Sequence, residues 1–166
     1  DNSYIVWSVI SSILKALNKL LLDDEELYPK FQAFAAMLIS GASVRCGWDA
    51  KPDDGHLGKM LRNILISMQG DYMQDNVNVV SEARSRFQRL REDPSSNAIP
   101  SEYKVAAFKI VLKASPTKGQ EEFDILQEFY KAADTDVERK HIIHSIGAAP
   151  SMELKRRVLE WTMSEI

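Results

Sequence analysis

Two histidines near the C-terminal end, His141 and His144, have the spacing most suited to holding a metal ion. Residues three positions apart lie on one face of a helix. A zinc-protease helix instead carries His-Glu-x-x-His, whereas the run here is His-Ile-Ile-His. A metal would also need a third ligand, for which Glu138 and Glu153 are the candidates. We therefore expect surface or interhelix histidines, and no metal site.

The single cysteine, Cys46, is the only candidate thiol nucleophile. The preceding Arg45 could lower its pKa, but the sequence offers no assignable base, so we expect a half-buried residue at a helix end. Acidic groups at residues 23–26 and 53–54 read as helix starts, where carboxylates complement the helix dipole. No glycine-rich phosphate loop, Gly-x-Ser-x-Gly elbow or calcium loop is present. We expect no catalytic residue in this chain.

Basic residues cluster twice without forming a nucleic-acid motif. One cluster lies within residues 84–91 and is interrupted by acidic residues, and the other is residues 155–157. Both read as solvated helix faces, and the formal net charge of −3 does not favour attraction to nucleic acid or to an anionic membrane. An RNA-binding helical repeat, a third possibility for the chain, would need a basic concave face.

The composition is that of an ordinary globular protein. Of 166 residues, 45% are apolar and 27% charged, and one cysteine excludes an internal disulfide. A lone cysteine and the lack of a glycosylation sequon favour the cytoplasm. No uninterrupted apolar run reaches the roughly 18 residues of a membrane span, and the N-terminus lacks the features of a signal peptide, so we expect no membrane partner. The chain lacks an initiator Met, and we expect it to be a piece of a longer protein.

Hydrophobic periodicity predicts helices along the whole chain. The first should bury Ile5, Val9, Ile13, Leu17 and Leu20 and be covered on two sides, Gly47 should end the second, and Gly70-Asp71 should end the third. The expected helices span residues 4–22, 25–46, 56–69, 74–91, 120–133 and 137–146, with a fifth helix capped by Ser101 and an eighth that starts at 150–151 and ends before Met163. The predicted fold is all-α: a HEAT- or armadillo-like α-solenoid of about four antiparallel helix pairs, forming a single domain over residues 1–166.

Four stretches in order give the chain a family resemblance. The most specific is residues 47–62, GWDAKPDDGHLGKMLR, with its pattern G-W, K, G-H-L and L-R. The other three are an opening Y-I-V-W at residues 4–7, an F-Q-A-F helix at residues 31–34, and a tail with I-P at 99–100, E-E-F-D at 121–124, Tyr130, I-G at 146–147 and Leu154. In these stretches the chain resembles the C-terminal helical domain of zinc aminopeptidases related to puromycin-sensitive and endoplasmic-reticulum aminopeptidases.

The resemblance implies that catalysis belongs to a different, upstream domain of a parent enzyme, which holds the zinc through His-Glu-x-x-His and a distal Glu. It implies that this piece forms part of a curved helical lid and scaffold over the active-site chamber, with further repeats after it. Implied partners are the catalytic domain of the same chain and the peptide substrate; no cofactor is expected in this piece. Asp54 stands where Glu is more usual, and Ala148-Ala149 where some relatives carry an Arg facing the peptide.

If any residue here faces substrate, we expect Lys15 and Arg62, polar groups at the ends of inner helices. The alternatives are a surface cation for Lys15 and an interhelix ion pair for Arg62. The function predicted for the whole is the non-catalytic part of a zinc-dependent aminopeptidase that removes N-terminal residues from peptides. The alternative function is a stand-alone helical-repeat adaptor that binds a protein partner.

Overall fold

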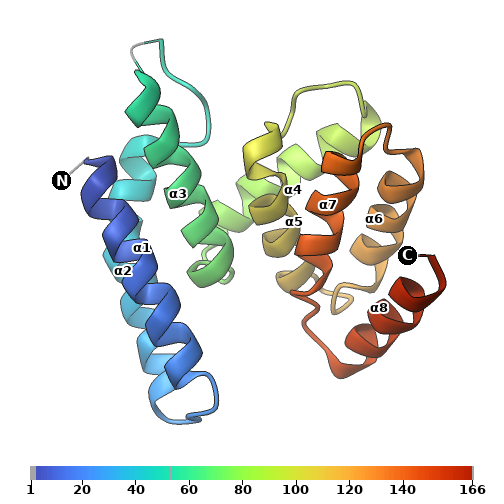
Figure 1. Ribbon diagram of the computed structural model, residues 1–166, viewed down its shortest axis with the longest axis horizontal. Helices are drawn as coiled ribbons and strands as arrows, with labels where there is room; N and C mark the ends of the chain where they lie inside the picture. The colour runs from blue at the N-terminus through green and yellow to red at the C-terminus, as the bar shows by residue number, and fades with distance from the viewer. Residues whose placement is uncertain (1–2, 53, 166) are drawn as a thin grey trace. The chain divides into compact units, whose positions relative to one another are not determined.

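The computed structural model describes residues 3–52 and 54–165, and every regular element within these ranges is helical (Figure 1). This confirms the predicted all-α class. In chain order the elements are α1 (Tyr4–Leu21), α2 (Leu27–Cys46), α3 (His56–Tyr72), α4 (Val77–Glu92), the short 3-10 helix η1 (Ser101–Tyr103), α5 (Lys104–Lys113), α6 (Gln120–Ala132), α7 (Asp136–Ile146) and α8 (Met152–Glu165).

The chain divides into two compact units, and each is described by itself. Unit 1 is Asp1–Met73 and contains α1, α2 and α3, whereas unit 2 is Gln74–Ile166 and contains α4 to α8. The boundary falls between α3 and α4, the two helices expected to form the second antiparallel pair. The single domain over residues 1–166 stays a prediction.

In unit 1, α3 packs against both α1 and α2 (Figure 1). The core between these helices is apolar and includes Ala35 and Ile39 of α2 and Leu65 and Met68 of α3, each at most 1% exposed. Phe31 of α2 meets Tyr72 of α3 edge to face, with ring centroids 5.9 Å apart. Gly47 ends α2 as predicted: it adopts a φ of 67° and donates its N–H to the Ser43 carbonyl.

The face of α1 that packs is not the predicted one. Trp7, Ser11 and Leu14 are buried, whereas the expected core positions Ile5, Val9, Ile13 and Leu20 are 53–78% exposed, and Leu17 is intermediate. The helix carries apolar residues on more than one face. Periodicity therefore identifies the apolar stripes of α1 but does not tell which stripe packs against α2 and α3.

Among the described residues, α1 has the length and composition of a helix that could cross a membrane. The apolar residues of α1 are interrupted by serines, an asparagine and two lysines. A core helix of a globular domain has the same length and composition. In unit 1, α1 packs against α2 and α3 through its buried stripe.

The predicted end of α3 at Gly70-Asp71 is wrong, because the helix continues to Tyr72. Gln69 and Gly70 are buried, and the side chains of Met68 and Tyr72 pack in the core on either side of them. Tertiary packing therefore outweighs the roughly 1 kcal/mol by which glycine disfavours a helix interior.

In unit 2, α5 is the central helix, packing against α4, α6 and α7. Phe87 of α4, Phe108 of α5 and Phe129 of α6 form an aromatic cluster, with ring centroids 5.8–6.3 Å apart. The turn before α6 requires Gly119, whose φ is 83°. A Cβ at this position would come within 2.7 Å of Leu154 and 3.2 Å of the Leu112 carbonyl oxygen.

The last helix, α8, packs on α6 through Trp161. Its indole contacts Phe123 and Tyr130 edge to face, at centroid distances of 5.8 and 5.0 Å. Leu154, nearer the start of α8, is fully buried. Aromatic and aliphatic contacts along α8 therefore join it to the rest of unit 2.

Replacing Leu14 with Ala should lower the free energy of unfolding by about 3 kcal/mol, because it removes a buried side chain and leaves a cavity. The matched Ile13→Ala, one position away on the exposed face, should cost less than about 1 kcal/mol. Urea denaturation followed by circular dichroism measures both. A larger loss for Ile13→Ala would show that the other face of α1 is the packed one.

Candidate functional site

The connection between α2 and α3 carries the most specific sequence motif, and Asp54 is at its centre. The Asp54 carboxylate accepts a hydrogen bond of 2.7 Å from the Lys51 backbone N–H, and the Asp54 N–H donates to the Lys51 carbonyl. The Lys51 ammonium in turn donates to the Arg45 carbonyl at the end of α2, at 2.8 Å. The loop is thus folded back on itself and attached to the preceding helix.

Arg62 of α3 binds this loop through its side chain. Its side chain is 1% exposed, and its guanidinium forms an ion pair with the Asp54 carboxylate at 2.5 Å. The same Nη2 lies 3.4 Å from the Cys46 carbonyl at the end of α2. A buried charge is costly unless it is paired and hydrogen-bonded, so the arginine requires this carboxylate beside it.

Two other residues of the motif have structural roles of the same kind. The Trp48 indole is buried and donates its N–H to the Gln69 side-chain oxygen of α3 at 2.9 Å. At Gly58 an added Cβ would lie 3.1 Å from the Asp54 carboxylate oxygen, so a larger residue there would crowd the carboxylate that Arg62 needs. Trp48 therefore attaches the connection to α3, and the small residue at Gly58 leaves room for the Asp54 carboxylate.

A cavity of about 180 Å³ lies beside this network, lined by α2, the loop and α3. Cys46 is on its wall, and burial raises the pKa of the thiol more than Arg62 lowers it. A raised pKa leaves the sulfur protonated at neutral pH, so it is a poor nucleophile. Arg45, the sequence's candidate for lowering this pKa, is not among the charges that act on it, which are those of Arg62, Asp54 and Lys51.

The two residues predicted to face substrate, Lys15 and Arg62, differ in exposure: the first is exposed and the second is buried. Lys15 is exposed on α1 and forms no ion pair within the part of the chain that the structure describes. Arg62 is buried, paired with a loop carboxylate rather than with another helix. Lys15 does not line the cavity beside Arg62, so the two do not form one site. Contact of either residue with substrate stays a prediction.

The two histidines of α7 do not share one environment. His141 is half-buried, and burial followed by the nearby Lys104 charge lowers its pKa, whereas His144 is exposed. Over residues 3–52 and 54–165 no three histidine, cysteine or acidic side chains are grouped as a metal site would require.

The interpretation of residues 84–91 as a solvated face is wrong for Arg86 and holds only in part for Arg84, whose side chain is 38% exposed. Arg86 is 4% exposed, pairs with Glu82 at 2.6 Å and donates to the Ala98 carbonyl at 3.1 Å. Arg84 donates to the Ala114 carbonyl at 2.8 Å. Both guanidinium groups therefore hydrogen-bond to backbone carbonyls in the segments that follow α4 and α5. Arg89 and Arg91 are exposed, as expected.

Residues 155–157 show the same mixture. Lys155 and Arg156 are exposed, but Arg157 pairs with Asp124, donates to Gln120 and lies over the Phe123 ring at 5.1 Å.

Of the acidic groups, Asp24 caps the start of α2 by accepting from the Glu26 and Leu27 backbone N–H groups, as predicted. Asp53 lies outside the described residues.

A larger cavity in unit 2 brings together Lys104, Asp134 and Glu138. The sequence marks Glu138 only as a candidate metal ligand, and no motif points to Lys104 or Asp134. They lie up to 34 positions apart on different elements, so no spacing along the chain signals that they meet.

Comparison with known proteins identifies the family of the chain. Residues 1–166 match the family described as the ERAP1-like C-terminal domain. The chain belongs to this family. The family resemblance carried by residues 47–62 and their flanks is thereby confirmed.

Similar proteins are aminopeptidases. Aminopeptidase M1-A of Oryza sativa subsp. japonica is 24% identical over 165 residues, which cover 99% of this chain and 19% of that protein. Aminopeptidase M1 of Arabidopsis thaliana is 24% identical over 98% of this chain and 18% of its own length. Aminopeptidase N of Plutella xylostella is 22% identical over 92% of the chain and 15% of its own length. The chain spans about a fifth of the length of the relatives it matches.

For this ERAP1-like domain, replacing Arg62 with Ala should lower the free energy of unfolding by about 3 kcal/mol, because the Asp54 carboxylate loses its buried partner. The matched Arg45→Ala, which removes an exposed arginine at the end of α2, should stay within about 0.5 kcal/mol of the unsubstituted chain. Chemical denaturation compares them. Equal losses would mean that Arg62 is not the residue that holds the loop.

The acid stability of unit 1 should depend on Asp54. The hydrogen bond from the Lys51 backbone holds the pKa of this carboxyl below its ordinary 3.8, and Arg62 adds to the effect. A lowered folded pKa stabilises the fold above pH 3.8, and this stabilisation is lost as the pH falls through the folded value.

The free energy of unfolding should therefore fall less steeply below pH 3.8 in Asp54→Asn than in the unsubstituted chain. Asp75→Asn, at an exposed position in the turn after α3, should leave the slope unchanged. Denaturation series at several pH values give the slopes. Identical slopes for Asp54→Asn and the unsubstituted chain would contradict the assignment.

Proposed function

We propose that the chain is a non-catalytic helical part of a zinc-dependent aminopeptidase that removes N-terminal residues from peptides. The observation that carries the proposal is the family match over residues 1–166, combined with relatives that are named aminopeptidases and are about five times as long. On this proposal the zinc and its ligands belong to a catalytic domain in another part of the parent chain.

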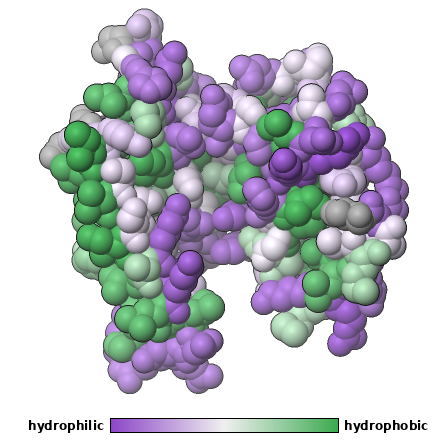
Figure 2. Space-filling model, viewed as in Figure 1, coloured by the Kyte–Doolittle hydropathy of each residue, from purple (hydrophilic) through white to green (hydrophobic). Residues whose placement is uncertain are grey.

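The proposed role of this part is a lid and scaffold beside the active-site chamber. An exposed apolar surface in unit 1 supports it, because large apolar patches on a protein surface are usually covered by a partner. Figure 2 shows apolar residues gathered along α1 on the face in view. The large exposed apolar residues of α1 and α2 are Ile5, Val6, Val9, Ile13, Leu20, Leu27, Phe34, Met37, Leu38 and Val44.

Partners of this part would then be the catalytic domain of the same chain and the peptide substrate. Lys15 is exposed, so a peptide could reach its side chain. Arg62 would meet a peptide only if its buried pair with Asp54 opened. We also propose that the parent works in the cytoplasm, supported by the single cysteine and the absence of a glycosylation sequon.

A stand-alone adaptor is the second candidate, and the same exposed apolar surface favours it. The two proposals differ in what precedes the chain in its gene. An aminopeptidase parent should encode His-Glu-x-x-His on the order of 300 residues or more before Asp1, the length of about two domains. An adaptor needs no such motif.

The assay that tests the proposal uses aminoacyl fluorogenic substrates. The isolated chain should give no turnover with or without added zinc, and the parent protein should hydrolyse the substrates and lose that activity to a chelator. Turnover by the isolated chain would contradict the placement of the chemistry. An inactive parent, folded and loaded with zinc, would favour the adaptor.

A further inference from the structure

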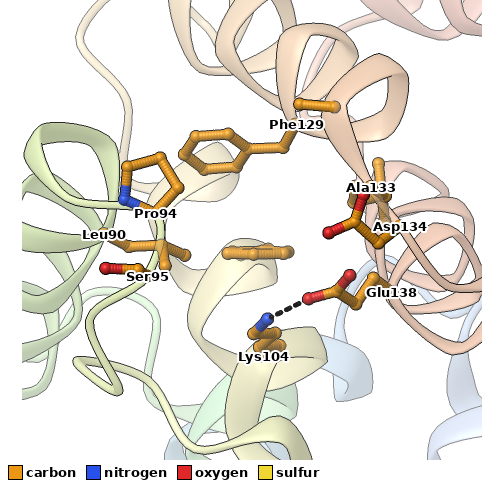
Figure 3. Close-up of a pocket in the computed structure, with 11 residues that line it drawn as sticks. Leu90, Pro94, Ser95, Lys104, Phe129, Ala133, Asp134 and Glu138 are labelled. Carbon is orange, nitrogen blue, oxygen red and sulfur yellow. Dashed lines mark hydrogen bonds and ion pairs between the residues drawn. The ribbon is translucent and has the colours of Figure 1, made fainter.

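A cavity of about 320 Å³ opens in unit 2 between the ends of several helices (Figure 3). Its volume falls at the lower end of the range of small-molecule sites, about 300–1,000 Å³. The walls come from α4, the loop that follows it, α5, α6, the α6–α7 turn and α7. Most of the wall is apolar, with Leu90, Phe108, Phe129 and Ile142 as the large side chains. An apolar group of a ligand would therefore be desolvated here.

The polar side of the cavity holds both signs of charge. The Lys104 ammonium of α5 lies 3.2 Å from a carboxylate oxygen of Glu138 on α7, and the lysine side chain is only 18% exposed. The hydrogen bond from Lys104 is the main cause that lowers the pKa of the Glu138 carboxyl, so this carboxyl is charged at neutral pH.

Asp134 supplies a second carboxylate. In Figure 3 its side chain points into the cavity from the α6–α7 turn, on the same side as Glu138. It forms no ion pair with any residue of the described ranges, so its negative charge is available to a ligand. The nearby His141 adds no charge at neutral pH, because burial lowers its pKa.

These groups define the chemistry of a ligand. Asp134 forms no ion pair within the described ranges and Glu138 lies beside it, so the two carboxylates can accept the ammonium of a ligand. The Lys104 ammonium has hydrogens beyond the one given to Glu138 and can donate to a carboxylate on the same ligand. The apolar wall accepts an aliphatic or aromatic side chain. The three requirements together describe one class of small molecule.

We propose that this cavity binds a free α-amino acid with an apolar side chain, such as leucine or phenylalanine. The cavity has the volume of roughly ten water molecules. An amino acid with about ten non-hydrogen atoms is of comparable size. The site is distinct from the Asp54–Arg62 network of unit 1, and it stands whether or not the parent is an aminopeptidase. If the parent is one, the ligand is of the class its reaction releases, so this part would sense product.

Titration of the ¹⁵N-labelled chain by NMR tests the proposal. L-Leucine and L-phenylalanine should shift amide signals at both ends of the cavity in a saturable way, with a Kd of about 1 mM for a ligand of this size. N-acetyl-leucine, which lacks the ammonium, and leucinol, which lacks the carboxylate, should each bind at least about tenfold more weakly. L-Glutamate should not bind, because its extra carboxylate would enter an apolar, negatively charged cavity.

Substitutions identify the groups responsible. Asp134→Asn and Lys104→Met should each weaken leucine binding at least about tenfold, and Ala132→Phe should abolish it by filling the cavity. The matched controls are Lys131→Met and Asp75→Asn, at exposed positions outside the cavity wall, which should leave the Kd unchanged. Asp134 is itself exposed, so its substitution remains informative if Lys104→Met disturbs the fold.

Three results would overturn the proposal. One is the absence of saturable shifts at a leucine concentration about ten times the expected Kd. Another is a Kd that neither Asp134→Asn nor Ala132→Phe changes. The third is equal affinity for leucine and leucinol, since the cavity would then recognise amines rather than amino acids. None of these results bears on whether the parent cleaves peptides.

Discussion

The burial of one positive charge constrains unit 1 more than any other interaction. Arg62 is almost fully enclosed, and a guanidinium in that position destabilises the fold unless acceptors surround it. The Asp54 carboxylate and the Cys46 carbonyl meet that requirement from two sides. The end of α2, the loop and the start of α3 are therefore fixed together. Lys51 and Arg62 belong to the most specific stretch of the family resemblance and take part in these contacts, so in unit 1 both residues serve the fold.

Unit 2 uses arginines in the same way. Arg86 and Arg84 of α4 donate to the Ala98 and Ala114 carbonyls, which belong to irregular segments that cannot satisfy their own backbone. Arg157 of α8 reaches Asp124 and Gln120 of α6 while its guanidinium lies over the Phe123 ring. In unit 2, arginines therefore attach irregular segments to α4 and join α8 to α6, alongside the apolar contacts between helices.

Sequence reasoning located the helices and the family because both depend on local signals: apolar spacing, Gly47 as a stop, Asp24 as a cap, and four motifs in order. It failed where the outcome depends on packing. The apolar residues of α1 do not reveal which face is covered, and Gly70 reads as a break until its burial is known. Charge runs such as residues 84–91 hide a buried Arg86. The cavity of unit 2 draws Lys104, Asp134 and Glu138 from separate elements, and no spacing predicts that.

The chain belongs to the ERAP1-like C-terminal domain family, and Arg62 serves its fold. The most direct test is a double-mutant cycle on the Asp54–Arg62 pair, measured as free energies of unfolding of the two single variants, the double variant and the unsubstituted chain. If the buried pair holds the loop, Arg62→Met combined with Asp54→Asn should destabilise the chain by much less than the sum of the single substitutions. Strictly additive effects would contradict the account.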